Sequence, residues 1–399
     1  MNTVKHIGVF GRRNAGKSSI VNLLLGQDFA IVSQQAGTTT DPVKKRMEIP
    51  GIGPVQLIDT AGVDDSGEVG QKRIAKTLKL VEEVDLAVLV FTGNVFGKEE
   101  KDLLRQFKEL DIPVVIVHNQ SDIIPLDYGV AGDLTNMYGC DVVEFSCCMM
   151  DPQEQKDAVE MLFAFIEKGL LLSGGEKSIM HGLVGEKENI VLVCPIDSEA
   201  PAGRMILPQV MAIRDILDNG GVAVVLQPEQ LKGYLDSNKD IKMVVTDSQA
   251  FKQVSEVVPA EIPLTSFSVL MARAKGPFEE YLKGVEAIGN LKDGANVLVL
   301  ESCTHHTSCD DIGRVKIPMM LQKKLGCKLN FTFVSGLDEL PPLKQFSLVL
   351  QCGGCMVTHR QLKNRLRKVI AAGVPVTNYG MCIAWVTGIF KRAVWPEML

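Results

Sequence analysis

The segment from Gly11 to Ser18 constrains the fold of this chain more than any other feature. It reads Gly-Arg-Arg-Asn-Ala-Gly-Lys-Ser, so a lysine and a hydroxyl residue follow the second of two spaced glycines. An apolar run, His6–Phe10, precedes it, and an amphipathic pattern, Lys17–Leu25, follows it. This order predicts a strand, a tight loop and a helix, with backbone N–H groups and the positive end of the helix dipole surrounding phosphate oxygens.

Apolar, β-rich runs alternate with helical patterns along the rest of the chain, which is typical of parallel βαβ units. We therefore predict an α/β fold. The chain has 399 residues, and single cores stop growing near ~250–300 residues, so several domains are expected. A glycine-containing stretch at 172–176 is typical of a linker. We predict a phosphate-loop domain over residues 1–170, a middle α/β domain over 176–262 and a C-terminal α/β domain over 263–399.

Composition excludes several classes of function. The chain has 42 Lys and Arg against 48 Asp and Glu, a net charge of −6, so we expect no nucleic-acid binding by bulk charge. No apolar run approaches the ~20 residues that span a bilayer, so no membrane association is expected. The N-terminus has no secretion-signal pattern, and we expect a cytoplasmic protein. Its 10 cysteines are then better explained as thiols or metal ligands than as disulfides.

The residues expected to handle a nucleotide's phosphates come from three segments. Lys17 would place its charge at the β- and γ-phosphates, and Ser18 would bind Mg²⁺. Asp59 and Gly62 belong to an Asp-Thr-Ala-Gly sequence after an apolar run; the carboxylate can hold Mg²⁺ through water, and the Gly62 N–H can sense the γ-phosphate. Thr39, in the preceding loop, can complete the Mg²⁺ shell. The predicted contacts of the phosphate loop are Gly11, Asn14, Ala15, Gly16, Lys17, Ser18 and Ser19.

A second motif predicts which base is bound. Asn119 and Asp122 lie in an Asn-Gln-Ser-Asp sequence at the end of another apolar run. An ionised Asp122 can accept hydrogen bonds from the N1–H and 2-amino groups of guanine. Adenine would present an acceptor there and leave buried acceptors facing one another. Ser146 and Cys147, after the next apolar run, would support the base. The motifs together predict GTP or GDP with Mg²⁺.

Through these motifs, residues 1–168 resemble the translation-factor-related GTPases of the Era and MnmE type. That family has lysine at the position of Gln120, so we expect weaker nucleotide affinity with unchanged specificity. Asp64 stands where Ras-like enzymes have their water-positioning glutamine, which predicts slow hydrolysis of GTP. Asn14 matches the asparagine that coordinates K⁺ in the MnmE-like group; the resemblance implies a K⁺ site, and the alternative is that Asn14 only stabilises the loop.

Three cysteines and a histidine follow two apolar runs in the last third of the chain. Cys303 and His305 form a Cys-x-His sequence, and Cys352 and Cys355 enclose two glycines. Open α/β sheets bind ligands at the carboxyl ends of their strands, so these side chains are expected to converge. They suit an iron–sulfur cluster and a Cys₃His zinc site about equally, with Cys309 as an alternative ligand. A redox dithiol is a third interpretation, which leaves Cys303 without a role.

An Era-like GTPase joined to Cys-x-His and Cys-x-x-Cys sequences in a C-terminal α/β domain resembles the [FeFe]-hydrogenase maturation GTPases, the HydF family. The resemblance covers the whole chain in domain order. It implies that Cys303, Cys352 and Cys355 hold a [4Fe–4S] cluster. Gln351 replaces a histidine that the family has directly before its Cys-x-x-Cys sequence.

The identity of the fourth cluster ligand is a separate prediction. His305 lies two residues after Cys303, and residues i and i+2 share one side of an extended segment. An imidazole ligand would leave one iron exchangeable, because iron–sulfur clusters prefer thiolates. Glu186 and Glu188, in the middle segment, are the alternatives.

The HydF resemblance also implies a function. The protein would be a scaffold or carrier that receives the di-iron precursor of the hydrogenase H-cluster from two radical-SAM maturases, HydE and HydG. It would deliver this precursor to apo-[FeFe]-hydrogenase. The middle segment is the dimerisation domain in this family, so a homodimer is expected, and GTP hydrolysis would regulate partner exchange. The alternatives are an Era- or MnmE-like GTPase of tRNA modification or ribosome assembly, and a zinc-stabilised regulatory GTPase.

Overall fold

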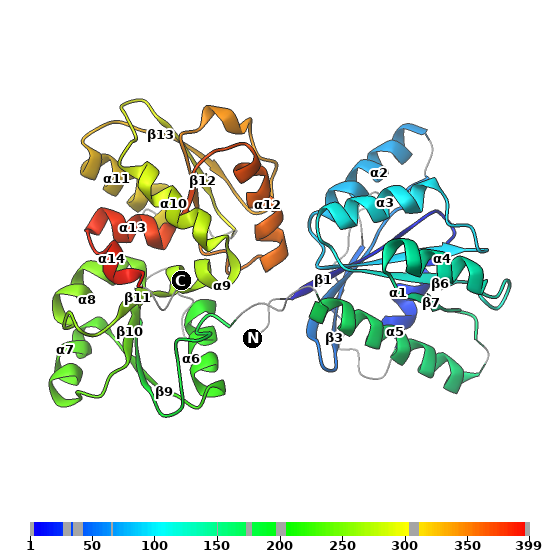
Figure 1. Cartoon of the computed structure of the whole chain (residues 1–399), viewed down its shortest axis with the longest axis horizontal. Helices are drawn as coiled ribbons and strands as arrows, with labels where there is room; N and C mark the ends of the chain where they lie inside the picture. Colours follow the sequence, from blue (N-terminus) through cyan, green and yellow to red (C-terminus); the bar gives the residue numbers. More distant parts are fainter. Residues whose placement is uncertain are drawn as a thin grey trace. The chain divides into compact units, whose positions relative to one another are not determined.

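The chain folds into two compact units, and the boundary between them in the sequence lies between Gly175 and Glu176 (Figure 1). The computed structural model describes residues 4–26, 33–34, 43–64, 67–149, 151–172, 178–196, 205–302 and 311–395. Strands and helices alternate through both units, so the predicted α/β class is confirmed. Among the described helices, none is both long enough and apolar enough to cross a membrane.

The N-terminal unit contains a sheet of seven strands in the order β2-β3-β4-β1-β5-β6-β7. β3 runs antiparallel to β2 and β4, and the remaining neighbours are parallel. Central strands such as β5, which is apolar and buried except at its last residue, Thr92, are covered on both faces, as parallel strands between two helix layers must be. The strands are β1 (Lys5–Gly11), β2 (Ser33–Gln34), β3 (Val43–Ile49), β4 (Gly53–Asp59), β5 (Leu86–Thr92), β6 (Val114–Asn119) and β7 (Val142–Glu144).

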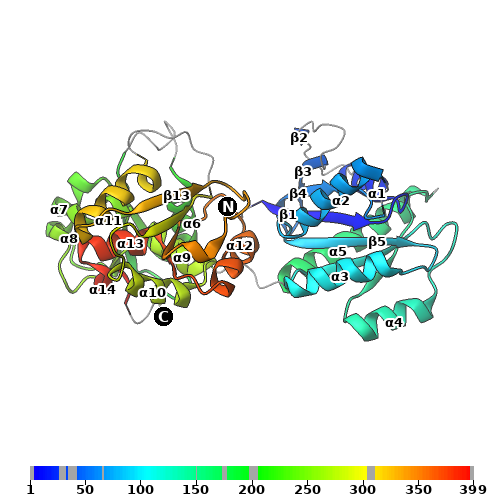
Figure 2. The same ribbon diagram turned by 90° about the horizontal axis from the view of Figure 1, so that it is seen from above.

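Helices cover both faces of this sheet: in Figure 1, α2 and α3 lie above its strands and α5 lies below them, and Figure 2 shows the same unit from above. One apolar cluster joins α1 and α5 to the first face, and another joins α2, α3 and α4 to the second. The amphipathic pattern predicted at Lys17–Leu25 is helical over those residues because its apolar positions are buried against the sheet. The helices are α1 (Lys17–Leu25), α2 (Gly67–Val81), α3 (Lys98–Glu109), α4 (Tyr128–Tyr138) and α5 (Pro152–Leu172).

The second unit contains two parallel sheets of four strands, in the orders β11-β10-β8-β9 and β13-β12-β14-β15. The first has β8 (Asn189–Val193), β9 (Val222–Leu226), β10 (Met243–Thr246) and β11 (Leu264–Ser266); the second has β12 (Asn296–Leu300), β13 (Asn330–Val334), β14 (Leu348–Gln351) and β15 (Val376–Asn378). The helices are α6 (Leu207–Asp218), α7 (Pro228–Ser237), α8 (Phe251–Val257), α9 (Phe267–Lys275), α10 (Phe278–Ile288), α11 (Ile317–Leu325), α12 (His359–Ala371), α13 (Tyr379–Thr387) and α14 (Phe390–Ala393).

A single apolar cluster runs through both sheets of the second unit. β11 pairs with β10, so the first sheet extends past the boundary that we predicted at residue 262. The C-terminal end of the chain also packs here, because the hydroxyl of Thr265 donates a hydrogen bond to the Ala393 carbonyl over 2.9 Å. The sequence did not predict this contact, because Thr265 and Ala393 lie far apart in the chain. The division into three domains stays a prediction.

Candidate functional site

The phosphate loop is wound so tightly that two of its positions require glycine. Gly11 has φ 144° and Gly16 has φ 87°. A Cβ atom at Gly11 would lie 2.2 Å from the Val90 carbonyl oxygen, and one at Gly16 would lie 2.1 Å from the amide nitrogen of Asn119. Only glycine tolerates both the positive φ and this close approach. The loop therefore lies directly against β5 and the Asn-Gln-Ser-Asp motif.

The lysine and serine that end this loop each contact a neighbouring part of the N-terminal unit. Lys17 is 7% exposed, and its ammonium group donates to the carbonyls of Gly11 (3.1 Å) and Arg12 (2.7 Å). The Ser18 hydroxyl donates to Asp59 Oδ2 over 2.5 Å. Asp59 Oδ1 is buried and has no hydrogen-bond partner among the described residues. A hydroxyl beside an unsatisfied carboxylate oxygen fits Mg²⁺, which prefers hard oxygen ligands.

The segment after β4 contacts the backbone of the phosphate loop. A Cβ at Gly62 would lie 2.8 Å from the Arg13 backbone nitrogen. Asp64 Oδ1 accepts a hydrogen bond from that same nitrogen over 2.6 Å. The carboxylate of Asp64 is thus engaged with the loop backbone, which the sequence pattern did not indicate. Thr39 lies outside the described residues.

The loop after β6 is hydrogen-bonded to the phosphate loop. The Asn119 side-chain amide donates to the Ala15 carbonyl over 2.9 Å. The Gln120 side-chain amide donates to the Asn14 carbonyl over 3.1 Å, with Gln120 at φ 63° and Asn14 at φ 58°. Gln120, which replaces the family's lysine, therefore joins the two nucleotide-binding loops.

The predicted base-binding residues lie together. The Ser146 hydroxyl donates to Asp122 Oδ1 over 2.5 Å, which orients the carboxylate. The Cys147 thiol donates to Asn119 Oδ1 over 3.8 Å. Burial, with smaller contributions from Cys148 and Asp122, raises the pKa of Cys147 to about 11. Cys147 is thus a neutral thiol at neutral pH.

One contact of the phosphate loop has no signal in the sequence. Arg12 Nε donates to Glu100 Oε1 over 2.6 Å, and its Nη2 donates to the Val95 carbonyl over 2.7 Å. Glu100 is fully buried, and its other oxygen accepts from the Gly97 N–H at the start of α3. Because the two partners are 88 residues apart, no local pattern could predict the pair.

Cys352 and Cys355 lie at the carboxyl end of β14. The Cys352 N–H donates to the Leu300 carbonyl over 3.0 Å, and the Ser302 N–H donates to the Cys352 sulfur over 3.0 Å. Gly354, at φ 67°, allows the chain to curl between the two thiols. The segment after β12 therefore begins beside Cys352.

The structure locates only some of the other predicted ligands. Cys303, His305 and the alternative Cys309 lie outside the described residues. In the described part of the chain, no three His, Cys, Asp or Glu side chains form a group that could hold a metal. Glu188 directly precedes the amino end of β8, where it pairs with Lys242 over 3.0 Å. Glu186 lies in the same loop, so neither glutamate is brought to the cysteines.

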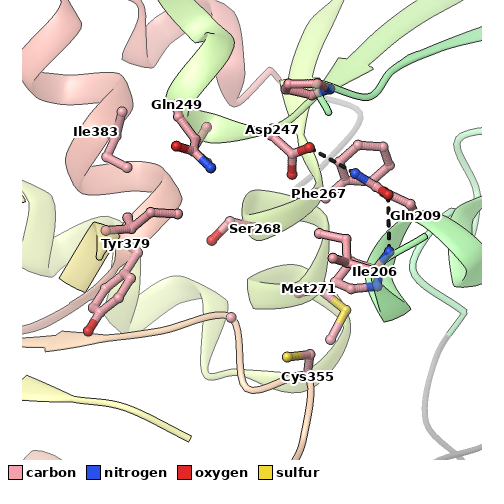
Figure 3. Close-up of a pocket in the computed structure, with 15 residues that line it drawn as sticks. Ile206, Gln209, Asp247, Gln249, Phe267, Ser268, Met271, Cys355, Tyr379 and Ile383 are labelled. Atoms are coloured by element: carbon pink, nitrogen blue, oxygen red, sulfur yellow. Dashed lines mark hydrogen bonds between the residues drawn. The ribbon is translucent and has the colours of Figure 1, made fainter. Parts of the chain in front are cut away.

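A cavity of about 200 Å³ opens beside Cys355 (Figure 3). It lies where the strands of both sheets end, since Pro195 follows β8, Asp247 follows β10 and Tyr379 follows β15. Two of its polar side chains bond to each other, since the Gln209 amide donates to Asp247 Oδ2 over 2.9 Å. Apolar side chains make up much of the remaining wall: Ile206, Pro208, Phe267, Met271, Ile312 and Ile383.

The chemistry of the described donors fits a thiolate-bound metal group. Burial, followed by the neighbouring Cys352, raises the pKa of Cys355, and Lys275 opposes this shift. Lys275 is 1% exposed, and its amine donates to the Val357 carbonyl over 3.1 Å, two residues after Cys355. Two thiols beside N–H donors from Ser302 and Gln351 would tolerate the negative charge of a metal–thiolate site.

Three family models match the chain. The model described as "50S ribosome-binding GTPase" matches residues 6–120. The model described as "Hydrogen maturase F dimerization domain" matches residues 179–276, and "Hydrogen maturase F tetramerization domain" matches residues 279–396.

Curated relatives match the N-terminal part of the chain. The tRNA modification GTPase MnmE of Nitrosomonas eutropha is 40% identical over 116 residues, which cover 28% of this chain and 25% of that protein. MnmE of a Sulfurovum species is 36% identical over 197 residues, covering 49% of this chain and 38% of that protein. The chain thus spans well under half the length of these relatives.

Solved structures of GTPases also resemble part of the chain. Aquifex aeolicus Era bound to GDP and AlF₄⁻ is 23% identical with a TM-score of 0.34, and the match covers 42% of this chain and 57% of that one. The G domain of the T. maritima FeoB iron transporter is 23% identical with a TM-score of 0.29, covering 40% of this chain and 99% of that one.

Proposed function

Because this chain belongs to the hydrogen maturase F family, we propose that it is a GTP-hydrolysing scaffold that carries a [4Fe–4S] cluster and delivers the di-iron precursor of the H-cluster to apo-[FeFe]-hydrogenase. One observation carries the proposal: a GTPase domain is followed, in order, by the two domains named for this maturase. The HydF resemblance noted in the sequence is thereby confirmed. The matches to MnmE and to the ribosome-binding GTPase model lie in the N-terminal part of the chain, so they support GTP hydrolysis rather than a role in tRNA modification or ribosome assembly.

The proposed GTPase reaction depends on the phosphate loop. Lys17 would neutralise charge on the β- and γ-phosphates, and the Gly62 N–H would contact the γ-phosphate. Ser18 and Asp59, with Thr39, would hold Mg²⁺, which supplies positive charge to the phosphates. Asp122 would select guanine. Asn14 would hold K⁺, so K⁺ would stimulate hydrolysis.

The contacts of Asp64 support the expectation of slow hydrolysis. Its carboxylate accepts the Arg13 N–H, and a carboxylate held on the loop backbone is poorly suited to orienting an attacking water. We propose that hydrolysis serves to change partner affinity rather than to drive cluster chemistry. The binding of the γ-phosphate would reorder the loops around it, as in other nucleotide switches.

The proposed cluster ligands are Cys303, Cys352 and Cys355, with His305 as the fourth. The Ser302 N–H lies 3.0 Å from the Cys352 sulfur, and Ser302 is covalently bonded to Cys303, which supports a shared site. The cluster would supply an iron–sulfur centre to which cargo can bind. The cavity beside Cys355, with its bonded Gln209–Asp247 pair and apolar wall, offers room for a weakly polar cargo such as a metal carbonyl.

Partner exchange would involve further copies of this chain, the two maturases and the apo-hydrogenase. The dimerization and tetramerization domains support self-association. β9 is at the edge of its sheet, with Val222 46% and Val225 44% exposed, so its free side could pair with a second copy. HydE and HydG would supply the precursor, and apo-[FeFe]-hydrogenase would receive it.

Anaerobic purification followed by iron, sulfide and zinc analysis tests the cluster. We expect a brown protein that bleaches with dithionite, and large iron losses in Cys303→Ala, Cys352→Ala and Cys355→Ala. The exposed Cys148→Ala variant is the matched control and should keep its iron. His305→Ala should keep a [4Fe–4S] signal with an altered electron paramagnetic resonance (EPR) spectrum. A colourless zinc protein would establish the regulatory alternative instead.

Delivery needs a separate assay. Protein co-expressed with HydE and HydG should activate purified apo-hydrogenase, whereas protein expressed alone should not. Equal activity from both preparations would contradict the carrier role without affecting the cluster assignment.

A further inference from the structure

We propose that Gln351 is a positioning residue whose side-chain amide donates a hydrogen bond to the Cys352 sulfur and so stabilises negative charge there. Gln351 is the last residue of β14 and is fully buried. In the sheet it is in register with Leu300 on β12 and Asn378 on β15. The inference rests on the proposed cluster and assigns to Gln351 a function other than ligation.

The surroundings of the amide determine which of its atoms faces the sulfur. Gln351 Nε2 lies 2.9 Å from Ser302 Oγ, 3.2 Å from the Cys352 carbonyl oxygen and 3.4 Å from the Cys352 sulfur. A carbonyl oxygen can only accept, so the reversed amide would place two acceptors against each other. The NH₂ group must therefore point toward Cys352.

Two N–H groups converge on this sulfur. The Ser302 N–H is 3.0 Å away and belongs to the backbone, so substitutions leave it in place. The Gln351 N–H is the donor that a substitution can remove. Hydrogen bonds to cluster sulfurs favour the more negative, reduced state and thus raise the reduction potential. Because the site is buried, the effect is larger than it would be in water.

The oxygen of the Gln351 amide offers an alternative role, ligation of iron, that an experiment must exclude. Gln351 Oε1 is buried and has no partner among the described residues. If this oxygen were the non-cysteine ligand of the cluster, its removal would change the coordination of one iron. Hydrogen bonding to Cys352 predicts a change in potential with unchanged iron coordination.

Redox titration of the reconstituted full-length protein separates these roles. Gln351→Leu should keep its iron and sulfide and the shape of its EPR spectrum, with the midpoint potential shifted to a more negative value. Gln351→His, which keeps an N–H donor, should return the potential toward that of the unchanged protein. The exposed Gln345→Leu is the matched control. An unshifted potential, or a changed EPR spectrum with iron retained, would overturn the proposal.

A measurement on metal-free, reduced protein tests the same hydrogen bond without the cluster. Without this donor, the Cys352 thiolate should be less stable, so alkylation of Cys352 should be several times slower in Gln351→Leu. Alkylation of Cys327, followed by mass spectrometry in the same sample, should not change. Equal Cys352 rates would contradict the hydrogen bond. Absence of iron and sulfide from the unchanged protein would instead contradict only the proposed cluster.

Discussion

The nucleotide site and the cysteine site differ in what holds them together. In the nucleotide site, hydrogen bonds within the chain join loops that are far apart in the sequence, such as those from Asn119 to Ala15 and from Ser18 to Asp59. At the cysteine site, the described thiols Cys352 and Cys355 have few partners. The first site is formed by the fold itself, and the second would be completed by its metal.

This difference predicts different responses to substitution. The phosphate loop depends on backbone geometry, at Gly11 and Gly16 above all, so removing one side chain there should remove a chemical function and leave the loop folded. A metal site that depends on a few ligands should instead lose its metal when one ligand is removed. Since the two sites lie in separate units, damage to one should spare the other.

The largest effect is expected from Lys17→Ala. Removing the ammonium group that we assign to the β- and γ-phosphates should slow GTP hydrolysis by about 10²–10³-fold or more. Steady-state phosphate release measures this, with the exposed Lys101→Ala as the control. Iron content should be equal in both variants. Hydrolysis at an unchanged rate would contradict the assignment of the loop, and loss of iron would contradict the independence of the sites.

Asp122→Asn should have the next largest effect. Asparagine offers guanine one acceptor and one donor group, so GTP binding should weaken by about 1–3 kcal/mol, or roughly ten- to a hundredfold. Xanthosine triphosphate, whose O2 can accept a hydrogen bond, should bind better than it does to the unchanged protein. Isothermal titration with both nucleotides measures this, and the exposed Asp133→Asn is the control. Equal GTP affinity would show that Asp122 does not recognise the base.

Exchange of K⁺ for Na⁺ should have a smaller effect. If Asn14 coordinates a cation, hydrolysis should be faster in K⁺ than in Na⁺ at equal ionic strength. Asn14 has φ 58°, so alanine would be strained there, whereas Asn14→Gly removes the side chain and tolerates the backbone conformation. The variant should hydrolyse GTP at the same rate in both salts. Equal rates in the unchanged protein would favour a purely structural role.

The smallest effect concerns the thiols beside the base-binding motif. Burial raises the pKa of Cys147 to about 11, and the thiolate is the reactive form. Cys147 should therefore alkylate slowly at neutral pH, with a rate that rises ~tenfold per pH unit up to about pH 11. The exposed Cys148 should react faster at neutral pH. Mass spectrometry of the alkylated peptides measures both rates, and rapid labelling of Cys147 at neutral pH would contradict its burial.

Several features of the nucleotide site could be predicted because they are local. The glycine spacing of Gly11–Ser18 and the apolar positions of α1 each specify a conformation over a few residues. The positions of Asp59 and Asp122 near strand ends could also be predicted, because each follows an apolar run; their ligands stay predictions. For the cysteine site, the two cysteines at the end of β14 could be found in the same way.

The contacts between these motifs could not be predicted from the sequence. Arg12 binds Glu100, Gln120 binds Asn14, and Gln351 binds the Cys352 sulfur and Ser302.

By itself, therefore, the sequence determined the α/β class, the phosphate loop and the base-binding motif of this protein. Only the tertiary structure decided that Gln120 joins two loops, that Asp64 is engaged with the backbone, and that Gln351 faces a sulfur. The physical reason is that a local pattern constrains only the residues within it. The order of the strands in each sheet determines which loops lie side by side. That order depends on the packing of the whole core, which no single segment of the sequence specifies.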